Sequence, residues 1–470
     1  MADAAVLGID LGTTEAKAAL VRLDGRLVGL GRAPYPLAMG PDGRAEQSPA
    51  DWWTAIATAV RSIDTTAVEV VGVCGVAQGP TLAVLDGEGM PVRPAITWQD
   101  RRAAGGEAGD FGLLPKLAWL AREEPASAAR AAWLTTAWDA LGLWLSGRAA
   151  TALQAHEKAL DEAVLRAAGV APGCVPGSVP VGSVLGPLRP AAAAALGLRP
   201  GIPVVAGVND GIASVLGAGL REPGDAVDTG GTSGGIGICA DRPLSLPGVY
   251  SAPSPIPGRW ILGGAMAALG ASVDWLRTAV LRERWSADEL FVAAARVPAG
   301  AEGLVFLPYL AGERAPLFDE DARGAFVGLT LAHGPADLAR AVLEGAAYAV
   351  RHVAEPIVAA GAPLRELRIA GRPTPGDLWT RIKADVVGVP AAVPALGETA
   401  VLGAAILAAA GTGSVDDLRA GVTAMTAVAR RIVPDPGAHA RYDELFAVYR
   451  DLYPALRPAF GRLRDLTTGR

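Results

Sequence analysis

The hydrophobic positions in the first thirty residues fall into short runs that are separated by turn residues. Apolar runs at Val6–Ile9, Ala18–Val21 and Leu27–Leu30 are joined by glycine-containing turns, one of them at Asp24-Gly25. Short runs joined in this way are typical of antiparallel strands connected by hairpins. The pattern therefore predicts an antiparallel meander in this part of the chain.

Helical spacing follows, and strand-like runs then return. Residues 48–51 (Ser-Pro-Ala-Asp) offer an N-cap serine, a proline at the first helical position and an early acid, and apolar residues recur at helical spacing over 53–60. Runs at 70–76 and 82–85 predict strands, and residues 115–147 predict mostly helix. This mixture predicts an α/β architecture in which helices pack on a mixed sheet.

A second copy of the opening pattern occurs near the middle of the chain. The stretch AVDTGGTSGGIGI, residues 226–238, carries Gly231-Thr232-Ser233. The stretch VLGIDLGTTEAKAALV, residues 6–21, carries Gly12-Thr13-Thr14 at the corresponding point. In both copies a strand-like run is interrupted by a glycine and two hydroxyl side chains, which indicates a duplicated domain.

The length of the chain agrees with this duplication. A chain of 470 residues is long enough for two or three domains. The segment 221–225, which is polar and contains proline and glycine, reads as a link before the second copy. We therefore expect two domains, at 1–223 and 224–470, with a cleft between them.

Composition excludes several classes of protein. The net charge is -6 and no cluster of Lys and Arg stands out, which argues against a nucleic-acid partner. Three cysteines, Cys74, Cys174 and Cys239, lie far apart in no metal-binding spacing, as in a reduced cytosolic protein. The longest apolar run, Val401–Ala410, is shorter than the roughly 20 residues that span a bilayer. We therefore expect a cytoplasmic protein that has no nucleic acid and no membrane as partner.

The two glycine-hydroxyl turns suggest a ligand. A glycine lets backbone N–H groups approach an anion closely, and threonine or serine hydroxyls add donors, so both turns are candidate phosphate loops. Asp10 precedes the first turn. A carboxylate beside a phosphate requires a cation between them, most often Mg²⁺. An isolated turn of this kind is equally compatible with an ordinary hairpin and a solvated aspartate.

The motifs of the chain, in their order and over nearly its whole length, resemble those of the FGGY carbohydrate kinases. These motifs are 8–14 (GIDLGTT), 45–49 (AEQSP), 94–102 (PAITWQDRR), 205–210 (VAGVND), 231–234 (GTSG), 306–314 (FLPYLAGER) and the final helical segment 442–456. The resemblance implies two actin-like (ribonuclease H-like) domains, each a mixed sheet flanked by helices. It also implies an N-terminal domain that binds sugar and carries the catalytic base, and a C-terminal domain that binds nucleotide.

The activity implied by the resemblance is transfer of the γ-phosphoryl group of Mg-ATP to a hydroxyl group of a sugar or polyol. Asp210 is the expected general base, because it follows the apolar run 203–208 and precedes a helix of small residues that begins near Gly211. The alternative for Asp210 is an N-cap of that helix.

The resemblance also assigns the phosphate and metal ligands. Phosphates are expected at Gly12, Thr13, Thr14, Gly231, Thr232 and Ser233. Mg²⁺ is expected at Asp10 and Asp210. Lys17 either adds a positive charge there or faces solvent, because four positions along an extended strand carry it away from the turn.

The nucleotide end shows a departure from the family. Gly371 and Arg372 stand in the loop where the family places a glycine-rich adenosine-binding segment, but Arg372 and Pro373 replace two of its glycines. Proline removes an N–H donor, and arginine adds bulk where the backbone normally approaches the nucleotide. Gly403 lies in a segment that resembles the family helix beside the adenine. ATP remains the expected nucleotide.

The sugar pocket is expected at Gln78, Trp98, Asp100, Asn209 and Asp210, with Trp53 or Asp139 as further candidates. After Gln78 the chain supplies neither the histidine of many pentulose kinases nor the Arg-Glu of glycerol kinases. A missing hydrogen-bond partner can change selectivity by orders of magnitude. We expect a pentulose such as xylulose, while a six-carbon ketose, a polyol and a sugar acid remain open.

Two other functions share this fold. An actin-like ATPase would use Asp210 to orient water and would need no sugar, and a degenerate member would bind sugar as a sensor, which the Arg372-Pro373 departure favours. Under the kinase hypothesis the partner is a small carbohydrate, and a homodimer is one admissible assembly.

Overall fold

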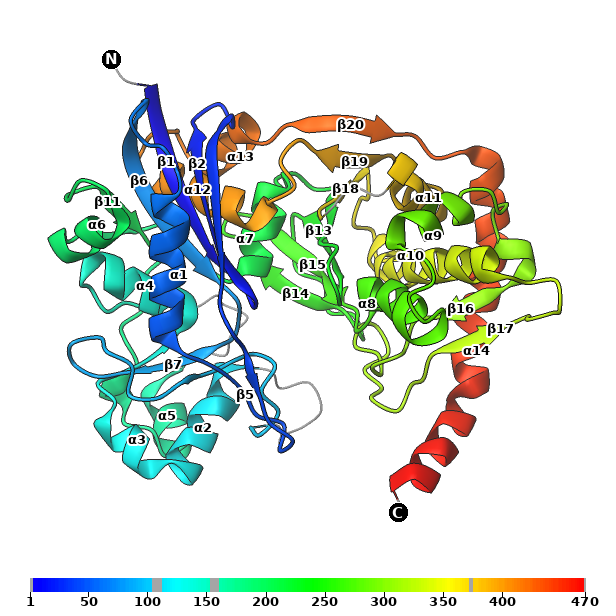
Figure 1. Ribbon diagram of the computed structural model, residues 1–470, viewed down its shortest axis with the longest axis horizontal. Coiled ribbons are helices and arrows are strands. Elements are labelled where there is room, and N and C mark those ends of the chain that lie inside the picture. Colours follow the sequence, from blue (N-terminus) through cyan, green and yellow to red (C-terminus); the bar gives the residue numbers. More distant parts are fainter. Residues whose placement is uncertain (1–2, 104–111, 153–159, 372–374, 469–470) are drawn as a thin grey trace. The chain divides into compact units, whose positions relative to one another are not determined.

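The computed structural model describes residues 3–103, 112–152, 160–371 and 375–468 (Figure 1). The chain divides into two compact units, each with a mixed sheet flanked by helices. Unit 1 comprises Met1–Arg221, Pro253–Pro257 and Glu398–Ala427, and unit 2 comprises Glu222–Ala252, Gly258–Gly397 and Val428–Arg470. The units are thus discontinuous in sequence, whereas the sequence predicted the two continuous ranges 1–223 and 224–470.

The main sheet of unit 1 has the strand order β10-β11-β6-β1-β2-β3. Its strands are β1 (Asp3–Leu11), β2 (Glu15–Arg22), β3 (Leu27–Pro34), β6 (Val68–Ala77), β10 (Val184–Pro187) and β11 (Pro203–Val205). The first three strands pair antiparallel, which confirms the predicted meander. Strands β1, β6 and β11 run parallel to one another, so their carboxyl ends lie at one edge of the sheet.

Helices pack on this sheet and on one another. They are α1 (Pro49–Arg61), α4 (Ala137–Ser146), α6 (Pro190–Leu196), α7 (Asp210–Gly217) and α12 (Thr399–Gly411). Helix α1 begins as predicted, with Ser48 as N-cap and Pro49 at the first position. Its apolar face buries Trp52 and Ile56 in the core. The sequence was sufficient to predict where this helix begins, because the capping residues act within one helical turn.

Helix α12 packs closely on β1 and α7 at glycine positions. A Cβ at Gly8 of β1 would come within 2.2 Å of the Val401 carbonyl oxygen, and a Cβ at Gly403 would come within 1.9 Å of the Ala213 carbonyl oxygen. The apolar run of α12 is therefore core of unit 1. No helix among the described residues is both long and apolar enough to cross a bilayer.

A second sheet of unit 1 has the order β4-β5-β8-β7-β9. Its strands are β4 (Ala38–Met39), β5 (Ala45–Gln47), β7 (Leu82–Leu85), β8 (Ala95–Ile96) and β9 (Trp133–Thr136). Unit 1 also contains the helices α2 (Leu113–Glu123), α3 (Pro125–Arg130), α5 (Glu162–Ala167) and α13 (Leu418–Met425). The segment predicted as mostly helical is interrupted by β9, because Trp133–Thr136 pairs antiparallel with β7. A partner strand nearly fifty residues away overrides the local helical pattern.

The sheet of unit 2 repeats the topology of the first. Its order is β14-β15-β13-β12-β18-β19-β20. The strands are β12 (Asp225–Asp228), β13 (Gly235–Ala240), β14 (Tyr250–Pro253), β15 (Trp260–Ala265), β18 (Glu366–Ile369), β19 (Ala391–Pro394) and β20 (Val428–Ile432). Strands β12, β13 and β15 pair antiparallel, and β12, β18 and β19 run parallel, as do their counterparts in unit 1. The predicted duplication is therefore present in the strand order.

Unit 2 contains the helices α8 (Leu269–Trp275), α9 (Ala287–Ala294), α10 (Pro335–Ala359), α11 (Leu378–Val387) and α14 (Pro436–Thr468), and the strand pair β16 (Val305–Leu307) and β17 (Ala325–Val327).

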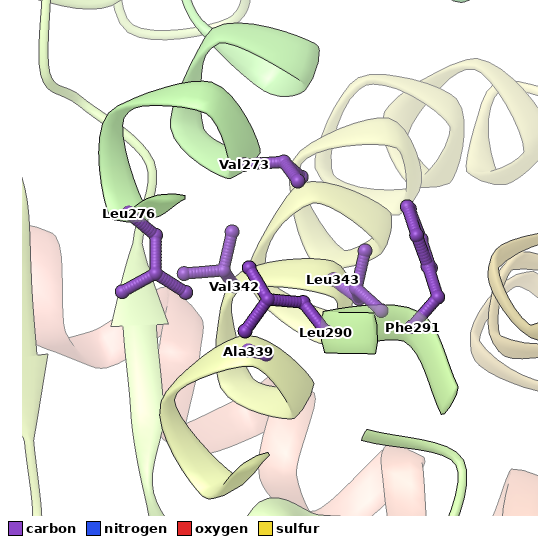
Figure 2. Close-up of a pocket in the computed structure, with 7 residues that line it drawn as sticks. All are labelled: Val273, Leu276, Leu290, Phe291, Ala339, Val342 and Leu343. Atoms are coloured by element: carbon purple, nitrogen blue, oxygen red, sulfur yellow. The ribbon is translucent and has the colours of Figure 1, made fainter. Parts of the chain in front are cut away.

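A cavity of about 10 Å³ lies among seven apolar side chains of α8 to α10 and the turn after α8 (Figure 2). A space of this size could fit about one water molecule, but a cavity lined only by apolar side chains stays dry because it offers water no hydrogen-bond partner. It is a packing defect of the core and too small for a substrate.

Candidate active site

The carboxyl ends of three parallel strands bring several predicted residues together in unit 1. The backbone N–H of Gln78, just after β6, donates to the Leu11 carbonyl at the end of β1 (2.8 Å). Ala77 forms an isolated parallel bridge with Asn209, which lies between β11 and α7. Ligands of open α/β sheets bind outside the carboxyl ends of the strands. Asp10, Gln78 and Asn209 thus lie at the edge where a ligand is expected.

Asp10 and Lys17 face each other across the β1–β2 hairpin, because they are direct partners in its antiparallel register. The Asp10 side chain is buried, and its Oδ1 has no hydrogen-bond partner among the described residues. Burial raises the pKa of Asp10 to about 6, although the positive charge of Lys17 opposes the shift. Lys17 Nζ also lies 3.0 Å from Glu398 Oε2. Lys17 therefore adds positive charge near the site, which was one of the two alternatives that the sequence left open.

Asp210 is the first residue of α7, and Asn209 is its N-cap. The Oδ1 of Asn209 accepts a hydrogen bond from the Gly211 N–H at 2.8 Å, so the alternative role of Asp210 as the N-cap belongs to its neighbour. Burial, followed by the negative charge of Asp10, raises the pKa of Asp210 to about 7. Two carboxyl groups that repel each other in this way share a preference for a proton or a cation between them.

The turn at Gly12–Thr14 is held by side chains from three other segments. Tyr35 donates its hydroxyl hydrogen to the Gly12 carbonyl. Gln47 Nε2 donates to the Thr13 carbonyl (2.6 Å), and Trp98 Nε1 donates to Thr13 Oγ1 (3.0 Å). The turn is thus fixed before any ligand binds. No pattern in the sequence signals a role for Tyr35 or Gln47, although Gln47 belongs to one of the family-like motifs.

Gln78 presents an acceptor without a partner. Its Nε2 donates to Gln47 Oε1 (2.6 Å), which also accepts from Trp52 Nε1 (3.1 Å). Its Oε1 is buried and has no hydrogen-bond partner among the described residues. A buried acceptor in this state carries a desolvation cost that a ligand donor would remove. The amide is therefore oriented by Gln47 and ready to accept a hydrogen bond.

Two other candidates for sugar binding have internal partners. Asp100 accepts hydrogen bonds from the Ala45 N–H (2.9 Å) and from the guanidinium of Arg102 (2.7 Å). Asp139 accepts from Thr151 Oγ1 (2.6 Å) and the Ala152 N–H (3.0 Å). The structure gives both aspartates a place in local polar networks that hold the chain together.

In unit 2 the predicted loop residues also come together at the carboxyl ends of parallel strands. Gly230, Gly231 and Gly234, in the loop after β12, adopt positive φ angles of 61°, 83° and 95°. A Cβ at Gly371, in the loop after β18, would lie 3.9 Å from the Gly230 Cα. Within the loop, Gly231 and Thr232 are exposed and Ser233 is half-buried. A Cβ at Gly230 would lie 2.5 Å from the Ala370 carbonyl oxygen, so the close approach of the two loops requires a glycine at this position.

Of the other two predicted nucleotide ligands, the structure places only Gly403. Arg372 lies outside the described residues. Gly403 lies on α12 in unit 1, where it makes room for the Ala213 carbonyl. The structure therefore does not bring Gly403 together with Gly231 and Gly371 within one unit.

No group of three or more His, Cys, Asp or Glu side chains in the described part of the chain is arranged to hold a metal ion. Asp10 and Asp210 provide two carboxylates. Magnesium commonly takes only one or two carboxylates and completes its shell with waters and substrate phosphates. The donor set therefore fits Mg²⁺ bound together with a phosphate better than a metal held by protein alone.

Comparisons with known proteins agree with this geometry. Residues 5–107 and 110–217 match the model of the N-terminal domain of the FGGY family of carbohydrate kinases, and residues 226–412 match the model of its C-terminal domain. Xylulose kinase of Klebsiella pneumoniae is 30% identical over 485 residues, which cover 96% of this chain and 99% of that protein. Gluconokinase of Bacillus subtilis is 28% identical over 506 residues, covering 99% and 98%.

A solved structure of similar sequence extends the comparison to the fold. The crystal structure of xylulose kinase from Rhodospirillum rubrum has 31% sequence identity and a TM-score of 0.85, and the match covers 97% of this chain and all of that chain. Both domains, their order and their fold are thus shared over nearly the full length. The chain belongs to the FGGY family of carbohydrate kinases.

Proposed function

We propose that this protein transfers the γ-phosphoryl group of Mg-ATP to a hydroxyl group of a small carbohydrate, with Asp210 as the general base. The observation that carries the proposal is the place of Asp210 at the start of α7, next to Asn209 at the carboxyl end of β6, where burial and the negative charge of Asp10 raise its pKa to about 7. A base is most effective when its pKa lies near the working pH. Phosphoryl transfer has a loose transition state, so the carboxylate needs to accept the hydroxyl proton only late in the reaction.

The unpartnered Oδ1 of Asp10 supports a magnesium ion. Asp10 and Asp210 would hold Mg²⁺ through oxygen atoms, and the ion would neutralise charge on the phosphates. Lys17, opposite Asp10, adds positive charge on the same side. Thr13 and Thr14 would supply hydroxyl donors to phosphate, while the cross-links from Gln47 and Trp98 keep their turn in place.

We assign sugar binding to the N-terminal domain, 1–223, and nucleotide binding to the C-terminal domain, 224–470. The loop of Gly231, Thr232 and Ser233 would receive phosphate, because positive-φ glycines expose backbone N–H groups to an anion. Gly371, which lies against this loop, would border the rest of the nucleotide.

The substrate that the site favours is a neutral ketose of the pentulose class, with xylulose as the first candidate. Gln78, Trp98 and Asn209 are uncharged, and Gln78 Oε1 is free to accept from a hydroxyl group in the described structure. A second candidate is a sugar acid such as gluconate, because one relative is a gluconokinase. A substrate carboxylate beside Asp10 and Asp210 would meet two negative charges, which favours the neutral sugar.

The test is ADP formation from Mg-ATP over a panel of ketoses, polyols and sugar acids. We expect formation of ADP that depends on xylulose or a related ketose. Dependence on gluconate would select the second substrate class. Hydrolysis that is independent of sugar would instead support an actin-like ATPase, and sugar binding without turnover would support a sensor.

A further inference from the structure

We propose that the buried ion pair between Asp228 and Lys383 is a positioning element for the loop Gly230–Gly234, which it holds in the conformation that receives nucleotide phosphate. This inference rests on the proposed function of that loop. Neither residue was assigned a role from the sequence, and neither is a ligand in the proposal. Their role would be exerted through the backbone of the loop.

One carboxylate connects the start of the loop to a helix. Asp228 is the last residue of β12 and is fully buried. Its Oδ1 accepts a hydrogen bond from the Gly230 N–H at 2.9 Å, and its Oδ2 lies 2.5 Å from the Nζ of Lys383 on α11. This carboxylate therefore links Lys383 to the first amide of the loop.

Lys383 is itself fixed to the core of unit 2. Only 3% of the residue is exposed, and its Nζ lies 4.5 Å from the centroid of the Trp379 ring. The indole N–H of Trp379 donates to the Leu343 carbonyl of α10 (3.1 Å). A cation over an indole ring is attracted to it, so the ammonium group has two partners that hold it in place. The chain of contacts runs from α10 through α11 to the loop.

The far end of the loop is held by backbone hydrogen bonds. Ser233 and Thr232 accept from the N–H groups of Leu269 (2.9 Å) and Ala271 (2.9 Å) on α8. The near end has the Asp228 carboxylate as its anchor. Glycine has more accessible backbone conformations than other residues, so anchors at both ends help a loop with three glycines to present its donors in one arrangement.

A contribution to stability does not by itself explain why a protein would bury an ion pair such as Asp228–Lys383. Apolar side chains that replace a buried ion pair often give equal or greater stability, whereas removal of one partner leaves an uncompensated charge. A pair that also fixes the first amide of a ligand loop has a second role. Since ground-state and transition-state phosphates would use the same donors, loss of the anchor should weaken nucleotide binding more than it slows chemistry.

The experiment uses the full-length protein and three variants. Asp228→Asn keeps an oxygen for the Gly230 N–H but leaves Lys383 unpaired, and Lys383→Met leaves Asp228 unpaired. The double variant removes both charges and keeps the acceptor oxygen. The matched control is Glu344→Gln, which breaks the buried pair between Arg340 Nε and Glu344 Oε1 (2.6 Å) in the same unit. Each protein is measured for Tm, KM for Mg-ATP, kcat with the active sugar, and Mg-ADP affinity by calorimetry.

We expect each single variant to raise KM for Mg-ATP and Kd for Mg-ADP by about tenfold, with kcat changed by less than about threefold. The double variant should return both constants to within about threefold of the parent, because the two changes compensate each other. Glu344→Gln should lower Tm and leave both constants unchanged. The inference is overturned if the single variants lower Tm as the control does while KM and Kd stay at parental values.

Failure of the proposed function is distinguishable from failure of the inference. A parent that binds Mg-ADP but phosphorylates no sugar overturns the kinase proposal, and the calorimetric Kd then still decides the role of the pair. A parent that does not bind Mg-ADP overturns both.

Discussion

Asp10 and Lys17 are seven positions apart in sequence and lie directly opposite each other in the β1–β2 hairpin. The lysine charge lowers the pKa of both Asp10 and Asp210, against the effect of burial. One cross-strand pair thus places a cation next to the two carboxyl groups on which the proposed chemistry depends.

Replacement of Lys17 should shift the pH dependence of turnover. A base acts in its ionised form, so kcat/KM should rise with pH as Asp210, with a pKa of about 7, loses its proton. Lys17→Met removes a charge that favours the ionised form, so the acidic limb should move to higher pH. The measurement is the pH profile of kcat/KM at one fixed Mg²⁺ concentration. Arg32→Met is the matched control, because Arg32 pairs with the same Glu398 and Glu15, and its profile should match the parent.

Replacement of Asp210 by Asn should reduce kcat by about 10²- to 10⁴-fold, the usual contribution of a general base. Asn has nearly the same shape as Asp, and the N-cap function belongs to Asn209, so α7 should persist. Mg-ADP affinity by calorimetry should remain close to that of the parent if unit 2 supplies most of the nucleotide contacts. A kcat within tenfold of the parent would contradict the role of Asp210.

Replacement of Gln78 should affect the sugar and leave the nucleotide unaffected. Gln78→Met removes the buried acceptor that we propose for a sugar hydroxyl, and loss of one such hydrogen bond costs about 1 to 3 kcal/mol, which is roughly 5- to 150-fold in KM for the sugar. KM for Mg-ATP should stay within about threefold. An equal rise in both KM values would show instead that the variant disturbs the Gly12–Thr14 turn through Gln47.

Asp139 should make the stability of the protein depend on pH. Burial raises its pKa from the ordinary 3.8 to about 6, although hydrogen bonds from Thr151, Ala152 and Thr136 oppose this. Between these pH values the folded state keeps a proton that the unfolded state has lost, so stability falls as pH rises from about 4 to about 6. The contribution lost is up to about 3 kcal/mol. Asp139→Asn should flatten this part of the Tm-against-pH curve relative to the parent, and parallel curves would contradict the assignment.

Replacement of Gly403 should show whether this residue serves helix packing or nucleotide binding. A Cβ at this position would lie 1.9 Å from the Ala213 carbonyl oxygen, so Gly403→Ala should force α12 away from α7 and destabilise the protein by about 3 kcal/mol. Gly461→Ala is the control, because a Cβ there meets no atom within 4 Å and alanine favours the helix. The measurement is Tm. A normal Tm with a raised KM for Mg-ATP would instead support the nucleotide role that the sequence resemblance implied for Gly403.

Much of the architecture could be predicted because it is encoded locally. The meander, the capped start of α1 and the two glycine-hydroxyl turns depend on residues within a few positions of one another, and their order along the chain identified the family. The position of Asp210 also followed from a local signal, since it stands where a buried run changes to a helix of small residues.

The features that could not be predicted depend on contacts between distant segments. The direction of Lys17 is set by strand register, which brings it back to Asp10. The partners of Asp228 and Gln78 come from α11 and β5, and no spacing in the sequence signals them. The strand β9 forms because β7 offers it a free edge. In each case a tertiary partner decides what a local pattern leaves open.

The placement of α12 has a consequence for biosynthesis. Residues 398–427 complete unit 1, yet they are translated after most of unit 2. Until then, the surface of β1 around Gly8 has no cover from this helix. Domains generally fold in the order in which they leave the ribosome, but here the N-terminal unit has to wait for a segment near the end of the chain. The first unit of this kinase therefore cannot be completed until residues 398–427 have been synthesised, when most of unit 2 has already been made.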